Sequence, residues 1–389
     1  NMKKISKILI AVSLLAVMTF GMTVMTMAEE KTITPSVSVN GNETSTTETY
    51  TYSNAATYKL ENLKGYYGIV IPVNVSQAGT LEFKYDVVKL DKSCDIDLYT
   101  DSKCTNRVSS SSNYITSGKS QETKYIPLSN GGTYYLRLRS YGTTVDTADV
   151  TNTFKISAKL YSKADREIKS GQTITYYRNS GDDNFYFKYK ANATGAVKLE
   201  FTYSLGSYVT ITDAKKKEIS EKEYVSSTLS GNSIILAVKK NATYYFKINS
   251  IGVTGSTSAG IGNLQTIKAT QIKIKAKGGA KKSKAANIKY NKTVKGVIVP
   301  GDKKAKWYKI SLKKGKKPAF VINGNITGSL NISVYTKKGK KISSNIFSAR
   351  KGKYNTYGTW KKGTYYIKVV RANSLSSGTF SIKNVQAKQ

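Results

Sequence analysis

Asp95 and Asp97 are the residues best placed for catalysis in this sequence. They lie in the stretch SCDIDLYTDSKC, where the alternation of a β-strand puts both carboxylates on one face. Two carboxylates this close could serve a glycoside hydrolase. The sequence shows no large enclosing domain around them, so we favour solvated or turn-capping acids over an active site.

Histidine is absent from the chain. Its absence excludes Ser-His-Asp and Cys-His catalysis, histidine-ligated zinc and the HExxH metalloproteases. The sequence also has neither a P-loop nor a dinucleotide-binding fingerprint. We therefore expect no enzymatic activity and no cofactor, and a secreted carboxylate-dependent glycoside hydrolase or lyase, or its accessory protein, is the alternative.

The acids of the same stretch also suggest a metal site. Asp91, Asp95, Asp97 and Asp101 could offer oxygen ligands to calcium. Their spacing is not that of an EF-hand loop, and the corresponding strand near the C-terminus, LNISVYT, has no acid. We favour acids that stay solvated in a turn, with a calcium site as the alternative, and expect no other metal.

Cys94 and Cys104 are the two cysteines of the chain. In an exported protein a lone pair of cysteines usually forms a disulfide. The bond needs Cα atoms within about 7 Å of each other, so the chain would have to turn near Tyr99. The repeat pattern places the turn later, near Asp101 to Lys103. We predict the disulfide, with two free thiols as the alternative.

Tyrosines beside a cation recur in three similar phrases, GTYYLRL from Gly132, ATYYFKI from Ala242 and GTYYIKV from Gly363. Alternation gives each phrase an apolar inner face and an outer face with a tyrosine and a cation. Aromatic faces with nearby cations could stack sugars or hold polyanions, whereas packing across strands is the alternative. The outer-face candidates are Tyr135 with Arg137, Tyr245 with Lys247, and Tyr366 with Lys368.

Basic residues concentrate in the last third of the chain. From residue 261 onward lie 31 of the 62 Lys and Arg residues but only one of the 24 acids, Asp302. Lysine is a hydrated point charge suited to diffuse attraction to a polyanion, whereas a merely solubilising surface is the alternative. Lysines beside glycine in predicted turns could form one cationic rim: Lys313, Lys314, Lys316, Lys317, Lys337, Lys338, Lys340, Lys341, Lys361 and Lys362.

Short alternating runs bounded by Gly, Asn, Asp and Ser predict the elements that position these residues. The inner faces of the three phrases read Tyr-Leu-Leu, Tyr-Phe-Ile and Tyr-Ile-Val, as expected for half-buried strands. The phrases recur at roughly 110 to 120 residues, the size of one sandwich domain. We predict an all-β chain of three tandem jelly-roll-like β-sandwich domains after an N-terminal signal helix.

The chain divides into five predicted parts. Basic residues at Lys3, Lys4 and Lys7, an apolar run and a small-x-small site at 26–28 predict a cleaved secretory signal peptide, with an uncleaved anchor as the alternative. The polar C-terminus predicts no transmembrane anchor after cleavage. The parts are a signal peptide at 1–28, a Ser/Thr-rich linker at 29–50, module 1 at 51–162, module 2 at 163–272 and the strongly basic module 3 at 273–389.

A fixed order of motifs recurs in the modules. Strands open in SGQTI and YNKTVKG, aromatic-rich strands follow in FYFKYK and WYKISL, and then come DIDLYT or NISVYT, GTYYIKV and a closing GTFSI. This order resembles the bacterial pre-peptidase C-terminal domain, a small β-sandwich appended to secreted enzymes. Module 1 lacks a clear opening strand and module 2 a clean closing motif. The resemblance implies an accessory role in binding or secretion beside a catalytic domain, and the sequence shows no such domain.

These observations predict an exported, non-enzymatic binding protein of a Gram-positive bacterium, extracellular or associated with the cell wall. We expect module 3 to attach it to an anionic cell-wall polymer or glycan through its lysines. An extracellular nucleic-acid binder is a third hypothesis. Without a groove-reading helix or a clear stacking platform, that binding would be non-specific, so we expect no specific nucleic-acid partner.

Overall fold

The structure of the chain is a computed structural model. The structure describes residues 44–45, 50–51, 56–60, 68–75, 77–90, 93–108, 111, 113–116, 118, 121–140, 152–178, 184–201, 206–225, 233–250, 264–348, 351–355 and 360–388. The predicted signal peptide at 1–28, Asp91 and most of the predicted linker at 29–50 lie outside these ranges. In the described part of the chain, no helix has the length and apolar character needed to span a membrane.

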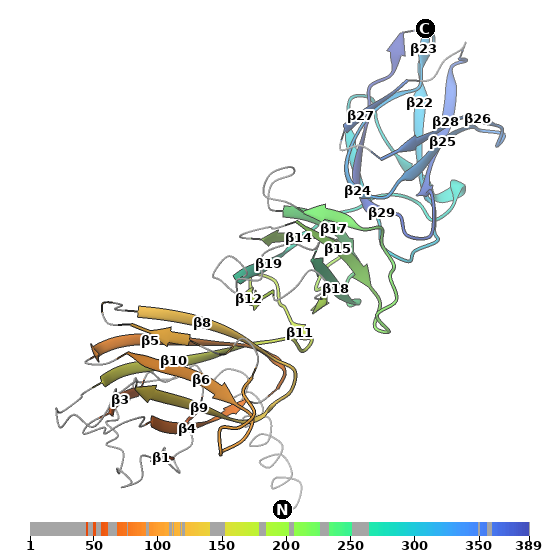
Figure 1. Cartoon of the computed structure of the whole chain (residues 1–389). Helices are drawn as coiled ribbons and strands as arrows, with labels where there is room; N and C mark the ends of the chain where they lie inside the picture. The colour runs from red at the N-terminus through yellow and green to blue at the C-terminus, as the bar shows by residue number, and fades with distance from the viewer. Residues whose placement is uncertain are drawn as a thin grey trace, which may run out of the picture. The chain divides into compact units, whose positions relative to one another are not determined.

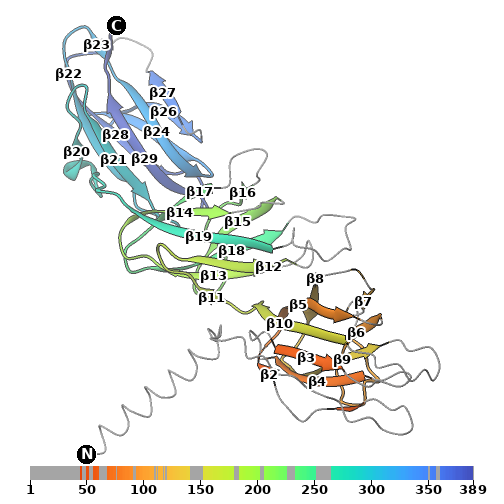
Figure 2. The ribbon, with the colours of Figure 1, turned by 90° about the vertical axis from the view of Figure 1, so that its left-hand side faces the viewer.

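The described chain is all-β, as predicted, and its main sheets form three successive pairs (Figures 1 and 2). In the first sandwich the sheet orders are β1-β4-β9-β6-β7, with β2 also beside β4, and β3-β10-β5-β8. Its strands are β1 (Thr44–Ser45), β2 (Tyr50–Thr51), β3 (Ala56–Leu60), β4 (Gly68–Val75), β5 (Gly79–Leu90), β6 (Cys94–Tyr99), β7 (Asn113–Ile115), β8 (Gln121–Leu128), β9 (Gly132–Ser140) and β10 (Asn152–Ser162).

The second sandwich repeats this arrangement with the orders β11-β13-β18-β15-β16 and β12-β19-β14-β17. Its strands are β11 (Arg166–Glu167), β12 (Thr173–Tyr177), β13 (Asn184–Lys190), β14 (Gly195–Phe201), β15 (Ser207–Thr212), β16 (Glu223–Val225), β17 (Ser233–Val238), β18 (Thr243–Ser250) and β19 (Leu264–Lys273).

The third sandwich has the orders β20-β22-β28-β25-β26 and β21-β29-β24-β27, and β23 pairs with β30 beside it. Its elements are the 3-10 helix η2 (Lys282–Lys284), β20 (Ala286–Asn287), β21 (Thr293–Ile298), β22 (Lys306–Leu312), β23 (Lys316–Lys317), β24 (Ala319–Thr327), β25 (Leu330–Thr336), β26 (Lys341–Phe347), β27 (Lys351–Asn355), β28 (Gly363–Arg371), β29 (Ser377–Asn384) and β30 (Ala387–Lys388).

The strand pairing identifies each sandwich as a jelly roll. In the second sandwich β12 pairs with β19, β13 with β18, β14 with β17 and β15 with β16, all antiparallel. Four successive strands therefore run against the next four in reverse order, which is one long antiparallel ribbon wrapped into two sheets. The first and third sandwiches repeat these pairs. In all three sandwiches a short parallel strand also lies beside the second strand of the ribbon, as β1 beside β4, β11 beside β13 and β20 beside β22.

The three repeated phrases occupy one position in this ribbon. They form β9, β18 and β28, and each of these strands is hydrogen-bonded within its sheet to one strand on either side. Their inner faces enter three separate apolar cores, where Leu136, Phe246 and Ile367 are buried and Tyr134 packs at the margin. A strand that is flanked on both sides and covered on one face needs alternating apolar residues, and this accounts for the recurrence of the phrase.

The described residues form two compact units, one that extends to Ala164 and one that begins at Asp165. The second unit contains both the second and the third sandwich. Whether these two are separate domains therefore stays a prediction, although β19 ends at Lys273 and β20 begins only at Ala286.

The segment between β19 and β20 makes regular backbone contacts in the structure. Gly279 and Trp307 exchange two backbone hydrogen bonds of 2.9 and 2.8 Å, and the amide of Lys277 donates to the carbonyl of Lys295 at 2.8 Å. The Tyr308 hydroxyl donates to the Lys277 carbonyl at 2.8 Å. These bonds attach the segment to the third sandwich along its length.

A junction within the second unit joins its two sandwiches. Ala237, Val297 and Val299 form a buried apolar cluster, with Ile274 packed against it. Beside it, the backbone amide of Glu221 donates to the Leu375 carbonyl at 3.1 Å, and the Asn373 side-chain amide donates to the Glu221 carboxylate at 3.0 Å. The two sandwiches therefore share both apolar and polar contacts.

Candidate functional site

The lysines predicted to form a rim lie at one end of the third sandwich. Leu312, at the end of β22, pairs with Gly363 at the start of β28, and Thr336 at the end of β25 pairs with Tyr365. The segments that follow β22, precede β28 and follow β25 therefore meet at the same edge of the sheet. These segments carry Lys313, Lys314, Lys316, Lys317, Lys337, Lys338, Lys340, Lys341, Lys361 and Lys362.

Tight turns hold these lysines in the solvent. Gly315 and Gly339 have positive φ angles of 70° and 96°, which residues other than glycine rarely adopt. The Thr336 hydroxyl accepts a hydrogen bond of 3.1 Å from the backbone amide of Lys340. All ten rim lysines are exposed except Lys316 and Lys317, which form β23 and are half-buried. Lys316 pairs with Lys388 of β30, which adds another cation to this end.

The rim has no acidic neighbour in the sequence of the third sandwich. Asp302 is the only acid from residue 261 onward, and it precedes β22, whereas the rim follows it. The seven residues of β22 separate the two ends by roughly 20 Å. This distance exceeds the Debye length of about 8 Å at physiological salt, so Asp302 does little to offset the rim charge.

The predicted pair Tyr366 and Lys368 lies on the outer face of the sheet that carries the rim. Lys368 is opposite Trp307 on one side, and Tyr366 is opposite Tyr335 on the other. The Trp307 and Tyr335 rings meet across the intervening strand β28, with centroids 5.3 Å apart, and the Lys368 ammonium lies 5.6 Å from the Trp307 centroid. The face is therefore a half-buried patch of aromatic rings and lysines next to the rim.

A lysine from η2 completes this patch. The Lys282 ammonium lies 4.8 Å from the centroid of the Tyr366 ring and donates a hydrogen bond of 2.7 Å to the Lys337 carbonyl in the rim. Sequence reasoning missed Trp307, Tyr335 and Lys282. Alternation in KWYKISL and LNISVYT already places Trp307 and Tyr335 on the outer face, but their meeting depends on the strand order.

In the second sandwich, the predicted pair Tyr245 and Lys247 is half-buried on the outer face of β18. The Lys247 ammonium forms an ion pair of 3.1 Å with the Glu218 carboxylate. Tyr245 lies opposite Lys188 and Thr212 on the neighbouring strands. This pair is therefore surrounded by the polar side chains of its own sheet.

In the first sandwich, Tyr135 and Arg137 are engaged by their own surroundings. Tyr135 packs against the buried cluster of Val70, Tyr99 and Cys104. The Arg137 guanidinium lies 4.6 Å from the centroid of the Tyr99 ring and 3.7 Å from the Asp97 carboxylate. Burial, and next the negative charge of Asp97, raise the pKa of Tyr99. These contacts indicate a structural role for this pair.

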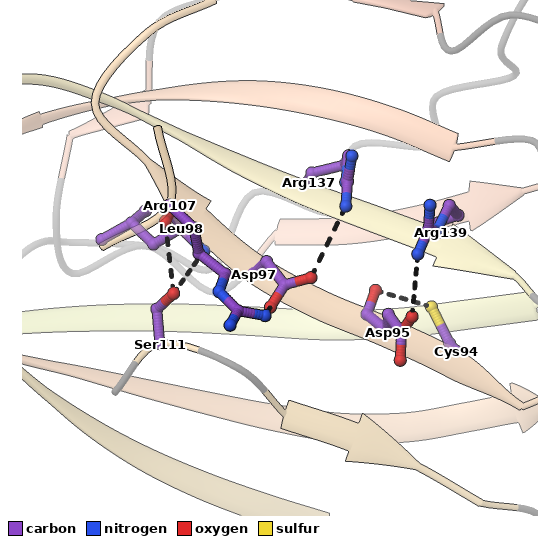
Figure 3. Close-up of polar contacts among 8 residues, drawn as sticks. All are labelled: Cys94, Asp95, Asp97, Leu98, Arg107, Ser111, Arg137 and Arg139. Carbon is purple, nitrogen blue, oxygen red and sulfur yellow. Dashed lines mark hydrogen bonds and ion pairs between the residues drawn. The ribbon is translucent and has the colours of Figure 1, made fainter. Parts of the chain in front are cut away.

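Asp95 and Asp97, the candidate catalytic acids, are held in ion pairs (Figure 3). Asp97 is 4% exposed and lies 3.7 Å from each of Arg107 and Arg137. Asp95 lies 3.2 Å from Arg139. Register explains the pairs, because Asp95 is opposite Arg139 and Asp97 opposite Arg137 on β6 and β9. Two acids bound to guanidinium groups are poorly suited to transfer protons to a substrate.

The calcium alternative fits the structure poorly. Asp101 caps its own turn, accepting backbone hydrogen bonds from Thr105 at 3.2 Å and Asn106 at 2.7 Å. The bond from Asn106 is the first cause of the lowered pKa of Asp101. Across the described ranges, three or more His, Cys, Asp or Glu residues nowhere gather as a metal site. Arginines beside Asp95 and Asp97 would also repel a cation.

The predicted disulfide between Cys94 and Cys104 is wrong. Both cysteines are buried and neither is in a disulfide. Cys94 begins β6, which runs extended for six residues to Tyr99, so the strand alone spans roughly 16 Å or more. The chain turns only at 101–104, where the Cys104 amide donates to the Asp101 carbonyl at 3.1 Å. The two thiols therefore lie in different clusters, well beyond disulfide reach.

No protein-family model matches the chain, and no curated protein matches its sequence. Among solved structures, the M60 catalytic domain with the CBM51-1 and CBM51-2 domains from Clostridium perfringens ZmpB is 9% identical, with a TM-score of 0.18, over 86% of this chain and 34% of that one. The chain thus spans about a third of that protein's length.

Two further solved structures are similarly distant. A triple jelly roll of an archaeal virus turret is 10% identical, with a TM-score of 0.18, over 82% of this chain and 81% of that chain. The PBSX exported protein XepA is 11% identical, with a TM-score of 0.16, over 55% of this chain and 82% of that chain. Likenesses at these TM-scores identify neither a family nor a function for the chain.

Proposed function

We propose that this chain is an exported, non-enzymatic binding protein that attaches to an anionic extracellular polymer through the lysine rim of the third sandwich. The ligand class is an anionic cell-wall polymer or glycan. The rim is defined by the ten lysines of the three turns at one end of that sandwich. The observation that carries the proposal is the strand register that brings these turns together, away from Asp302.

Charge of this kind suits a flexible polyanion. Closely spaced lysines act together, because their separations are comparable to the Debye length of about 8 Å at physiological salt. Lysine ammonium groups bind phosphate or carboxylate without a fixed fork geometry, in contrast to arginine. A polymer that presents repeated anionic groups can therefore engage several turns at once and gain avidity from each.

The patch beside the rim extends the same surface. Trp307, Tyr335 and Tyr366 offer ring surface next to the ammonium groups of Lys282 and Lys368. A glycan that alternates sugar rings with anionic groups would find apolar and cationic contacts in one continuous area. This combination favours an anionic glycan over a simple inorganic anion.

The ion pairs of the first sandwich and the N-terminal sequence bear on activity and location. The ion-paired state of Asp95 and Asp97 favours a non-enzymatic protein over a carboxylate-dependent hydrolase. The signal sequence predicted at 1–28 favours an extracellular or wall-associated location. The resemblance of the motif order to pre-peptidase C-terminal domains is compatible with such a role, and the ancestry of the modules stays a hypothesis.

The test is binding of the full chain to isolated Gram-positive cell walls and to soluble teichoic acid at several salt concentrations. Retention should fall steeply as salt rises and should disappear when teichoic acid is stripped from the walls. Retention that is indifferent to both treatments would refute attachment by charge. Turnover of any glycan that Asp97→Asn abolishes would refute the non-enzymatic assignment.

A further inference from the structure

Four outward side chains form a row across one sheet of the second sandwich. Asn184 on β13 is opposite Asn249 on β18, Asn249 is opposite Tyr208 on β15, and Tyr208 is opposite Tyr224 on β16. The row reads Asn-Asn-Tyr-Tyr, and at about 4.8 Å between strands it extends for roughly 14 Å. The adjacent inward row, which includes Ile248 and Val209, is buried, so this row faces outward.

The two tyrosines form an exposed aromatic pair. Each side chain is 38% exposed, although both rings are large and apolar. Their centroids are 5.6 Å apart with an interplanar angle of 58°. Gly206, with a φ of +66°, lies under Tyr224, and a Cβ atom there would come within 2.7 Å of the Tyr224 hydroxyl. The backbone therefore leaves the space that this ring occupies.

The two asparagines continue the row with amide groups. The Asn249 side-chain amide donates a hydrogen bond of 2.8 Å to the Asn184 side-chain carbonyl, in an exposed position. That bond orients the two amides toward each other and uses one of the two donors of Asn249. A hydrogen-bonded amide pair beside an aromatic pair offers ring surface and orienting polar groups in a line.

The surroundings of the row favour an uncharged ligand. In the next outward row Lys247 is paired with Glu218 at 3.1 Å. Tyr186 lies opposite Lys247. The Lys216 ammonium lies 4.3 Å from the centroid of the Tyr186 ring and forms an ion pair of 2.9 Å with Asp165. Lys216 and Lys247, beside the row, are thus each matched by an acid, in contrast to the rim lysines.

We infer that this row is a second binding site, and that it takes an uncharged, extended saccharide chain. Sugar rings would lie on Tyr208 and Tyr224 with their apolar faces, and their hydroxyls would hydrogen-bond the amides of Asn184 and Asn249. Two rings and two amides offer far less than the roughly 800 Å² per partner of a standard protein interface, which disfavours a protein partner. The inference does not depend on the rim.

The experiment is affinity electrophoresis of the full chain in gels that contain β-glucan, xylan or glycol chitin. At least one of these uncharged polymers should retard the protein, and high salt should leave the retardation unchanged. The double variant Tyr208→Ala with Tyr224→Ala should lose about tenfold or more in apparent affinity. Asn249→Ala should weaken retardation without abolishing it, since the rings remain.

Two controls separate binding from folding. Tyr290→Ala removes another tyrosine, 55% exposed, and should leave retardation unchanged. Tyr208→Phe with Tyr224→Phe keeps the rings and should retain most of the affinity, and each variant is checked for an unchanged thermal transition. The inference fails if none of the three polymers retards the protein, if the alanine variant is retarded like the native chain, or if the row captures a protein instead. These outcomes leave teichoic acid binding by the rim untouched, because that binding is measured separately and depends on salt.

Discussion

Leu312 and Gly363 face each other across β22 and β28. This pairing places the turn at 313–317 beside the turn at 361–362, although nearly fifty residues of sequence separate them. The pairing of Thr336 with Tyr365 adds the turn at 337–340 to the same edge. A jelly roll thus converts three separate lysine-glycine turns into one cationic surface.

Removing charge from the rim should weaken binding to teichoic acid. We expect the variant Lys313→Gln, Lys314→Gln, Lys338→Gln and Lys361→Gln to bind less tightly at every salt concentration. The slope of log K against log salt should become shallower by up to about one for each lysine in contact, because fewer counterions are released. Titration of the polymer at four salt concentrations measures both effects.

A matched variant tests position against total charge. Lys273→Gln, Lys275→Gln, Lys303→Gln and Lys304→Gln remove the same number of charges from exposed sites outside the rim. This variant should keep most of the affinity and the native slope. Equal losses in the two variants would show that net charge, and not the rim, controls binding.

The cysteines should behave as two buried thiols outside any disulfide. We expect Cys94 and Cys104 to react slowly with a thiol reagent in the native protein, because they are 0% and 9% exposed. In denaturant, two thiols per chain should react at once, and a reducing agent should leave the native melting temperature unchanged. A lowered melting temperature under reduction, or an intact mass lower by two hydrogen atoms, would show a disulfide instead.

The junction between the second and third sandwiches should resist proteolysis until it is disrupted. Ala237→Arg places a long charged side chain in the buried contact with Val297 and Val299, at a cost of about 1–3 kcal/mol or more. Cleavage within 275–285 should then become roughly tenfold faster or more. Ala214→Arg, in an exposed turn, is the control and should cleave like the native chain. Rapid native cleavage near Gly278 would show that the junction is open.

Stability should fall at alkaline pH through buried tyrosines. Burial is the main cause that raises the pKa of Tyr85, Tyr176 and Tyr308 in the folded chain. Unfolded tyrosine ionises near pH 10, so above that pH the unfolded state binds fewer protons than the folded state. Their stabilising contribution is therefore complete below about pH 10 and is lost as the pH rises toward their folded pKa values.

One arginine acts in the opposite direction. Burial lowers the pKa of Arg166 to about 10, so its contribution to stability rises as the pH passes from about 10 toward its unfolded value. One arginine opposes three tyrosines, and the net change should be destabilising. Urea unfolding followed by circular dichroism from about pH 8 to pH 11, with tyrosinate absorbance, measures the balance. A urea concentration at the unfolding midpoint that increases as the pH is raised above 10 would contradict this expectation.

The sequence by itself determined the strands and the side chains that enter the cores. In GTYYIKV, alternation predicts that Tyr365, Ile367 and Val369 point inward, and all three are buried. This information is local, because successive side chains of a strand point to opposite faces whatever its neighbours are. The same alternation predicted the all-β class and the outward placement of Tyr366 and Lys368. Charge counts likewise showed the basic last third without any structure.

Only the tertiary structure decided which distant residues meet. Alternation cannot show that Trp307 and Tyr335 join across β28, because their strands are not sequential and the order β22-β28-β25 is set by the wrapping of the whole ribbon. Cys94 and Cys104 are only ten residues apart in sequence, but the extended strand β6 separates them. Asp97, by contrast, lies opposite Arg137, forty residues away in sequence. Strand order depends on pairing between residues far apart in the sequence, so the local alternation of side chains does not determine it.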